Sequence, residues 1–162
     1  MAKMASRIPW RTKLEHPKAK LPKIVAVPPK WRKQYGGGTM LIAHPLEVDA
    51  LIRRVPKGRL VTVGQLRERL ARRHSADCTC PLTTGIFVRI AAEAAEEDRR
   101  AGKKRIAPYW RVVREDGSLN EKYPGGTAGQ ARKLRAEGFA IAAGKASKPR
   151  VRDLAGRLLR LR

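Results

Sequence analysis

The sequence predicts a small α+β domain with basic extensions at both ends, and three observations lead to this prediction. The chain has 162 residues, of which 42% are hydrophobic, enough for one compact core. Its central part contains three helical segments, two extended segments around an Asp-Gly turn and a fourth helical segment, in that order. Its formal net charge is +23, and the most intense positive charge lies in the two ends.

The first two predicted helices lie between Pro45 and about His74. Pro45 opens the first helix, whose apolar side chains share broadly one side, and Pro56 closes it. The second begins at Thr62-Val-Gly-Gln65, which has the pattern of a capping box. In such a box the threonine hydroxyl accepts a bond from the third amide, and the glutamine reaches back to the first.

The third predicted helix starts at Pro81, runs to about Arg100 and ends near Gly102. After it, the segments "IAPYWRVVRE" and "SLNEKY" flank Asp116-Gly117. This dipeptide tolerates the positive φ angles of a tight turn, so the two segments are predicted to form a β-hairpin.

The fourth predicted helix begins at Thr127-Ala-Gly-Gln130, a second capping-box pattern, and ends at Gly138. The order helix, helix, helix, hairpin, helix is that of a winged helix-turn-helix. In that arrangement the third helix is the one presented to DNA, and the hairpin forms the wing.

Both ends of the chain are strongly basic. Residues 1–40 hold ten lysines and arginines against the single acid Glu15, with five prolines and a run of three glycines. They are predicted to form an extended arm with a flexible hinge. Residues 145–162 hold seven lysines and arginines against Asp153, and "VRDLAGRLLRLR" predicts a short amphipathic helix formed on contact with a partner or the core. Aromatic side chains that could anchor parts of the arm are Trp10, Trp31 and Tyr35.

The predicted organisation is therefore an arm at 1–40, a domain at 41–142 and a tail at 143–162. The charge predicts a polyanionic partner and salt-dependent binding to nucleic acid. We find no long apolar span and no signal-peptide segment, and we expect a soluble cytoplasmic, nucleoid-associated monomer without membrane contact. We expect no cofactor.

Three segments of the predicted domain together resemble the O6-alkylguanine-DNA alkyltransferase family. "VPKGRLVTVGQL" resembles that family's I-P-x-G-x-V-T-T-Y-G-Q-I, and "IAPYWRVVREDGSL" resembles its I-P-C-H-R-V-V-x-x-D-G-x-L. "YPGGTAGQARKLRAEG" resembles its closing Y-x-G-G…K-x-x-L-L-x-x-E-G. The three segments keep the family's order and spacing over about residues 45–140. The resemblance implies the family's DNA-binding fold, approached from the minor groove.

The residues that the resemblance aligns with the alkyl-transfer site have changed. Family members flip an alkylated guanine out of the duplex and transfer the alkyl group to a cysteine. Here Tyr109 stands at the cysteine position and Trp110 at that of the histidine that activates it, while Glu137 matches the carboxylate that orients the histidine. Val63 replaces the tyrosine beside the rotated phosphate, and the arginine finger falls near Thr84. A phenol is a poor nucleophile at neutral pH and tryptophan is no base, so we expect no alkyl transfer at Tyr109.

The nearest functional analogue is the alkyltransferase-like proteins, which lack the cysteine, bind alkylated DNA and recruit other repair proteins. We predict a non-enzymatic protein of this type that binds double-stranded DNA, with recognition of damaged bases in repair left open. Tyr109 and Trp110 either fill the former site or keep a base-binding pocket. We call Val63, Tyr109, Trp110 and Glu137 the vestigial pocket. Predicted DNA contacts are Thr62, Gln65, Thr83, Thr84, Gly85, Arg89, Arg111 and Ser118.

Two other functions remain as alternatives. The first is a basic structural protein associated with RNA or the nucleoid, without lesion specificity. The second is a residual enzyme that uses Cys78 or Cys80, since Cys80 precedes a predicted helix start where thiols become reactive. His74 and the two cysteines lack the paired spacing of structural zinc ligands, so we expect no metal site. The cysteines are too close to each other for an unstrained disulfide.

Overall fold

The structure is a computed structural model that describes residues 8–143 and 148–162. Residues 1–7 of the predicted arm and 144–147 of the predicted tail lie outside the described residues. The helices are α1 (Trp10–Glu15), α2 (Arg32–Tyr35), α3 (Pro45–Arg53), α4 (Val63–Arg73), α5 (Pro81–Arg100), α6 (Gly126–Ala136) and α7 (Leu154–Arg157), with 3-10 turns η1 (Pro29–Trp31) and η2 (Tyr109–Arg111). The strands are β1 (Lys23–Ala26), β2 (Thr39–Ile42), β3 (Val61–Thr62), β4 (Cys78–Thr79), β5 (Val112–Val113), β6 (Ile141–Ala142) and β7 (Arg150–Val151).

The predicted helices of the central domain are confirmed as α3, α4, α5 and α6. The Thr62 hydroxyl accepts a bond from the Gln65 amide at 3.2 Å, and the Gln65 side chain accepts one from the Thr62 amide at 2.9 Å. The capping box predicted at Thr127 is wrong, because α6 starts after Gly125 without a side-chain cap. The Gln130 side chain instead accepts a bond from the Asn120 amide and donates to main-chain carbonyls of the η2–β5 segment.

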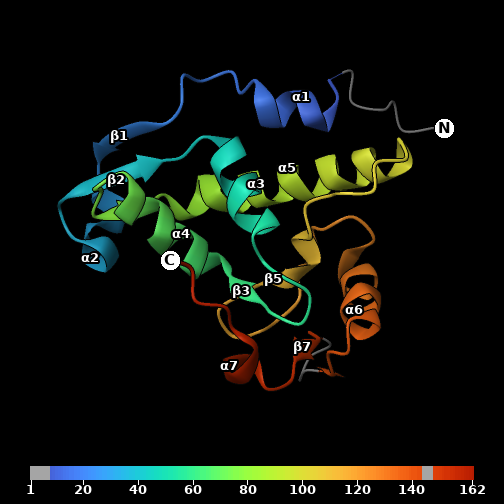
Figure 1. Ribbon diagram of the computed structural model, residues 1–162. Coiled ribbons are helices and arrows are strands. Elements are labelled where there is room, and N and C mark those ends of the chain that lie inside the picture. The colour runs from blue at the N-terminus through green and yellow to red at the C-terminus, as the bar shows by residue number, and fades with distance from the viewer. Residues whose placement is uncertain (1–7, 144–147) are drawn as a thin grey trace.

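The core forms around α5, which crosses the middle of the molecule (Figure 1). Val88 and Ala91 of α5 pack in one cluster with Ile52 of α3 and with Leu66 and Leu70 of α4. All five side chains are buried. Burying apolar area of this kind is the main source of stability, so α3, α4 and α5 form the rigid centre that positions the surfaces described below.

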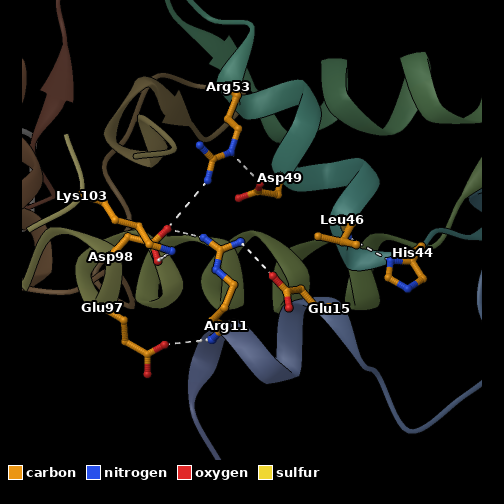
Figure 2. Close-up of polar contacts among 9 residues, drawn as sticks. All are labelled: Arg11, Glu15, His44, Leu46, Asp49, Arg53, Glu97, Asp98 and Lys103. Carbon is orange, nitrogen blue, oxygen red and sulfur yellow. Dashed lines mark hydrogen bonds and ion pairs between the residues drawn. The ribbon is translucent and has the colours of Figure 1, made fainter. Parts of the chain in front are cut away.

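The N-terminal segment is folded onto the domain from residue 8 onward, so the expectation of an extended arm is wrong for the described part. Leu14 of α1 is fully buried against the main core. The carboxylate of Glu97 accepts bonds from the amides of Trp10 and Arg11, and the Arg11 guanidinium pairs with the buried Asp98 (Figure 2). Arg53 and Lys103 also reach Asp98. The positive charge of the segment is thus partly neutralised by acids of α5.

The rest of the N-terminal segment completes a small sheet in the order β1-β2-β4. β1 pairs antiparallel with β2, and β2 pairs parallel with β4. Of the aromatic anchors expected from the sequence, Trp10 packs on the main core, while Trp31 and Tyr35 pack around Val27 and Met40. The prolines of the N-terminal segment therefore lie at bends between short helices and strands that pack on the domain.

The predicted β-hairpin around Asp116-Gly117 is limited to its turn, where the Arg114 amide donates to the Ser118 carbonyl at 3.1 Å and the Gly117 amide to the Arg114 carbonyl at 2.8 Å. Gly117 has the expected positive φ of 81°, and the Asp116 carboxylate accepts a bond from the Ser118 amide. However, β5 pairs parallel with β3, whereas Leu119 donates to the Pro149 carbonyl of the C-terminal segment. The turn chemistry was predicted correctly, but the partners of the two extended segments are distant in sequence.

The C-terminal segment is also docked, and only α7 of the predicted amphipathic helix is helical. β7 pairs antiparallel with β6, and Leu158 forms a bridge with Leu60. Leu161 is buried in the main core. In Figure 1 the C-terminal end of the chain lies beside α4.

Candidate nucleic-acid interface

The N-terminal half of α5 exposes large apolar side chains. Leu82 and Ile86 are 59% and 48% exposed, although both are large and apolar. They lie four residues apart, so they share one side of the helix. Gly85 beside them has open space where a Cβ would stand. Arg89 is exposed, with its guanidinium carbon 5.9 Å from the centre of the Trp10 ring. We call Leu82, Gly85, Ile86 and Arg89 the α5 face.

The start of α5 has no side-chain cap, since Cys80 precedes it and Pro81 is its first residue. The first amides of a helix carry partial positive charge and have no partner within the helix. An anion that approached the α5 face would therefore meet these amides first.

Three of the predicted DNA-contact side chains are buried and bond internally. Thr84 is 1% exposed, and its hydroxyl donates to the Cys80 carbonyl at 2.7 Å. Thr62 is 4% exposed and caps α4. Ser118 is 3% exposed and lies in the Asp116-Gly117 turn. Their burial corrects the prediction, because a side chain that holds the fold from inside does not reach a ligand outside.

Gln65 and Arg111 are also engaged within the protein. The Gln65 amide nitrogen donates to the Leu159 carbonyl at 2.7 Å. Arg111 donates to the Glu137 carboxylate and to the Val55 carbonyl at 2.7 Å. These contacts occupy donors of both side chains, and the two residues stay predicted DNA contacts. Of the predicted contact residues, Gly85 and Arg89 of α5 are exposed, and Thr83 is half-buried with its hydroxyl donating to the Cys80 carbonyl at 3.5 Å.

Tyr109 is buried at the centre of the vestigial pocket. Its hydroxyl donates to a Glu96 oxygen at 2.8 Å, and its ring stands edge-on to those of Trp110 and Tyr123, with centroids 5.3 Å away in both cases. Burial and the bond to Glu96 raise the pKa of the Tyr109 phenol well above its ordinary value. The phenol thus stays protonated at neutral pH, and its oxygen faces an internal carboxylate.

Glu137 holds together the residues that follow Tyr109. Trp110 donates its indole N–H to Glu137 Oε2 at 2.8 Å, and Arg111 forms an ion pair with the same oxygen at 2.8 Å. Burial opposes ionisation of Glu137, but the bonds from Arg111 and Trp110 outweigh it and hold its pKa below the ordinary value. Glu137 is thus a structural partner of both Arg111 and Trp110.

The vestigial pocket is filled with packed side chains. Val63, the first residue of α4, and Trp110 are half-buried against the core that contains Tyr109. Lys133 lies over the Trp110 ring, with its ammonium 4.9 Å from the ring centre. The arrangement agrees with the interpretation that Tyr109 and Trp110 fill the former site by packing.

A carboxylate at the start of α4 could not be predicted from any local pattern. The side chain of Glu115, on the loop after β5, accepts a bond from the Gly64 amide. A Cβ at Gly64 would collide with this carboxylate. The two residues are 51 positions apart, so no local pattern could show the contact. An acid therefore occupies the second amide of α4, and this helix start is less open to phosphate than that of α5.

The cysteines and the histidine between α4 and α5 have separate surroundings. His74 Nε2 lies 2.6 Å from Glu47 Oε1. The Cys78 thiol donates to the Thr39 carbonyl, burial raises its pKa, and Cys80 is buried. Over residues 8–143 and 148–162 we find no group of three metal-ligating side chains that could hold an ion. Within the same ranges, every helix is too short or too polar to cross a lipid bilayer.

Comparison with known proteins finds a likeness in structure only. No protein-family model and no curated protein matches the sequence. Two solved structures match: S. pombe Atl1 in complex with damaged DNA containing O6-carboxymethylguanine, and S. pombe ATL in complex with DNA. The first is 16% identical with a TM-score of 0.51 and the second 17% identical with a TM-score of 0.53. Each match covers 72% of this chain and 94% of the other. The α+β fold of this chain is therefore similar to that of two proteins solved on DNA.

Proposed function

We propose that this protein binds double-stranded DNA through the α5 face, as a non-enzymatic member of the alkyltransferase-like group. The observation that carries the proposal is the fold shared with two S. pombe proteins that were crystallised with DNA. The sequence motifs that resemble the alkyltransferase family lie within this same fold. The α5 face supports the proposal independently, because its helix start is uncapped and its apolar side chains are exposed.

The excess of basic residues supplies most of the affinity. A net charge of +23 attracts phosphates, and releasing counterions from DNA makes such binding strongly dependent on salt. Exposed apolar side chains beside a basic residue suit a DNA groove, in which apolar wedges contact sugars and base edges. Leu82 and Ile86 beside Arg89 have this composition.

The protein does not accept an alkyl group at the position of the family's cysteine. Tyr109 is a buried phenol of raised pKa, and Trp110 offers only an N–H that already bonds Glu137. The nearby carboxylates, Glu96 and Glu137, have lowered pKa values and are therefore too weak as bases to take the proton of the phenol. Incubation with duplex DNA carrying a labelled methyl group on guanine is expected to leave the protein unlabelled. Labelling that Cys80→Ser abolishes would instead establish the residual cysteine enzyme.

A second candidate function is recognition of alkylated guanine. It is favoured by one observation, the O6-carboxymethylguanine in the DNA bound to the first structural neighbour. The packing of Tyr109 and Trp110 weighs against it, because a flipped base needs an empty pocket. On this physical ground we propose binding without base flipping.

The deciding experiment is a titration of plain and O6-methylguanine duplexes of one sequence at three salt concentrations. We expect equal affinities for the two duplexes and a steep fall with salt. Tenfold tighter binding of the damaged duplex would replace our proposal with lesion recognition. A structured RNA that outcompetes both duplexes would replace it with the RNA-associated alternative.

A further inference from the structure

A basic hollow lies on the other side of α4 from the core. Its volume is about 570 Å³, and it forms between α4 and the C-terminal segment. Four arginines line it, Arg69 and Arg72 from α4 and Arg160 and Arg162 from the C-terminal segment, and Glu68 has the one acidic side chain in the lining. Like charges gathered in one concave surface repel one another. A hollow with this lining therefore favours an anion.

The four guanidinium groups have no acidic partner among the described residues. The ion pairs of the described chain all involve other basic side chains. Arg53 and Arg111, by contrast, each have a carboxylate within 3 Å. In addition, the Nε of Arg69 is buried and has no hydrogen-bond partner within the described ranges. A buried donor without a partner is costly, so its presence calls for an explanation.

The two walls of the hollow are held in place before any ligand arrives. The Leu159 carbonyl accepts a bond from Gln65 of α4 at 2.7 Å, and the Leu159 amide donates to the Leu60 carbonyl at 2.8 Å. Arg72 donates to the Leu161 carbonyl at 3.4 Å, and the Leu161 side chain is buried. A site whose walls are already ordered loses little entropy when it binds.

We propose that this hollow is a binding site for phosphate groups, separate from the α5 face. The planar guanidinium offers paired N–H donors that match two oxygens of one phosphate, and several such groups can share a diphosphate. The volume exceeds the roughly 30 Å³ of a single water many times, which leaves room for more than one phosphate. Phosphate binding itself does not depend on the proposed function. If the phosphates belong to a nucleic-acid backbone, the proposal rests on the proposed function, which is binding of double-stranded DNA.

The test compares two charge-matched double variants. Arg160→Ala with Arg162→Ala removes two exposed guanidinium groups from the lining of the hollow. Arg100→Ala with Arg105→Ala removes the same charge from exposed residues at and just beyond the far end of α5 (Figure 1). A third variant, Arg69→Ala, removes the buried unpaired donor, and its melting temperature without ligand shows whether it folds.

The first readout is the rise in melting temperature with inorganic pyrophosphate. We expect pyrophosphate to stabilise the unmodified protein, because a ligand that binds only the folded state raises its stability. The Arg160/Arg162 variant and Arg69→Ala should bind pyrophosphate about tenfold more weakly, as expected when charge-assisted hydrogen bonds are lost. The Arg100/Arg105 variant should keep most of the rise. Equal losses in the two double variants would overturn the proposal, since they would show binding to net charge alone.

The second readout identifies the source of the phosphate. If the hollow holds the backbone of duplex DNA, losing two phosphate contacts lowers the slope of log affinity against log salt by about 1.8. A weakened pyrophosphate effect with an unchanged DNA slope supports the same site with a free phosphorylated compound as its ligand. If the unmodified protein fails to bind duplex DNA but keeps an arginine-dependent pyrophosphate effect, the proposed function is wrong and the phosphate site stands.

Discussion

Trp110 donates its indole N–H to Glu137 at 2.8 Å. In the alignment that the motifs imply, these residues stand at the positions of the histidine and of the carboxylate that orients it. The resemblance therefore places this hydrogen bond where the family has its histidine–carboxylate contact, but an indole donates a hydrogen bond and takes up no proton. The contact has become part of the scaffold that joins η2 to the end of α6.

The first prediction concerns Glu137→Gln. The substitution leaves Arg111, a largely buried cation, without its carboxylate, and we expect the free energy of unfolding at pH 7 to fall by about 2–3 kcal/mol. Urea denaturation measures this change. Glu121→Gln, at an exposed position, is the control and should stay within about 0.5 kcal/mol.

The same pair predicts a pH dependence. The folded pKa of Glu137 lies below its ordinary value, so the folded state binds its proton more weakly than the unfolded state does. Its stabilising contribution is complete above the unfolded pKa of about 4.5 and is lost as the pH falls through the lower folded value. Between pH 5 and pH 3 the unmodified protein should therefore lose more stability than Glu137→Gln. Parallel pH profiles for the two proteins would contradict this.

A second prediction separates Tyr109 from the DNA interface. Tyr109→Phe removes the donor to the buried Glu96 and should cost about 1–3 kcal/mol of stability, because that carboxylate loses one of its partners. The affinity for duplex DNA should stay within twofold of the original. A tenfold change in affinity at unchanged fold would place the Tyr109 hydroxyl at the interface, against our interpretation of the vestigial pocket.

A third prediction tests whether the N-terminal segment belongs to the core. Leu14 is fully buried, so Leu14→Ala should lower the free energy of unfolding by about 2–5 kcal/mol. Ile24, which is 49% exposed on β1, provides the matched control, and Ile24→Ala should change the free energy by about 0.5 kcal/mol or less. Similar small effects at both positions would mean that the segment is the extended arm expected from its composition.

A fourth prediction concerns the α5 face. Leu82→Glu or Ile86→Glu places an acid where we propose that DNA binds, and each should weaken duplex binding about tenfold, equivalent to about 1.4 kcal/mol. Leu46→Glu introduces the same charge at a 39% exposed leucine of α3 and should have a much smaller effect. Gel-shift titrations at one salt concentration measure all three. Equal losses at Leu46 and Leu82 would indicate a purely electrostatic effect.

The sequence predicted the helices of the domain well because their boundaries are set locally. The capping residues of α4 and the prolines that open α3 and α5 act within a few positions of the helix start. The capping box at Thr127 failed although its letters match, because Gln130 has partners in the η2–β5 segment and Gly125 adopts the left-handed conformation. Local patterns thus hold where no distant group competes for the same side chain.

The partners of the two ends could not be predicted from the sequence. Composition showed a proline-rich basic segment, but the acids that hold it, Glu97 and Asp98, lie more than 80 positions away. The Asp-Gly turn fixed the path of the chain at Gly117, yet not which strands would pair on either side of it. For the same reason, the predicted contacts Gln65 and Arg111 were already bonded to distant parts of the chain.

The bond from Gln65 to Leu159 joins residues 94 positions apart, which makes the fold depend on the timing of protein synthesis. At roughly 5–20 residues per second, about 5–20 s pass between the translation of α4 and that of its C-terminal support. During that interval α4 and α5 can form, because their signals are local, but Leu60 lacks its partner from residues 158–159. We therefore expect the nascent chain to complete its core only after Leu161 has left the ribosome.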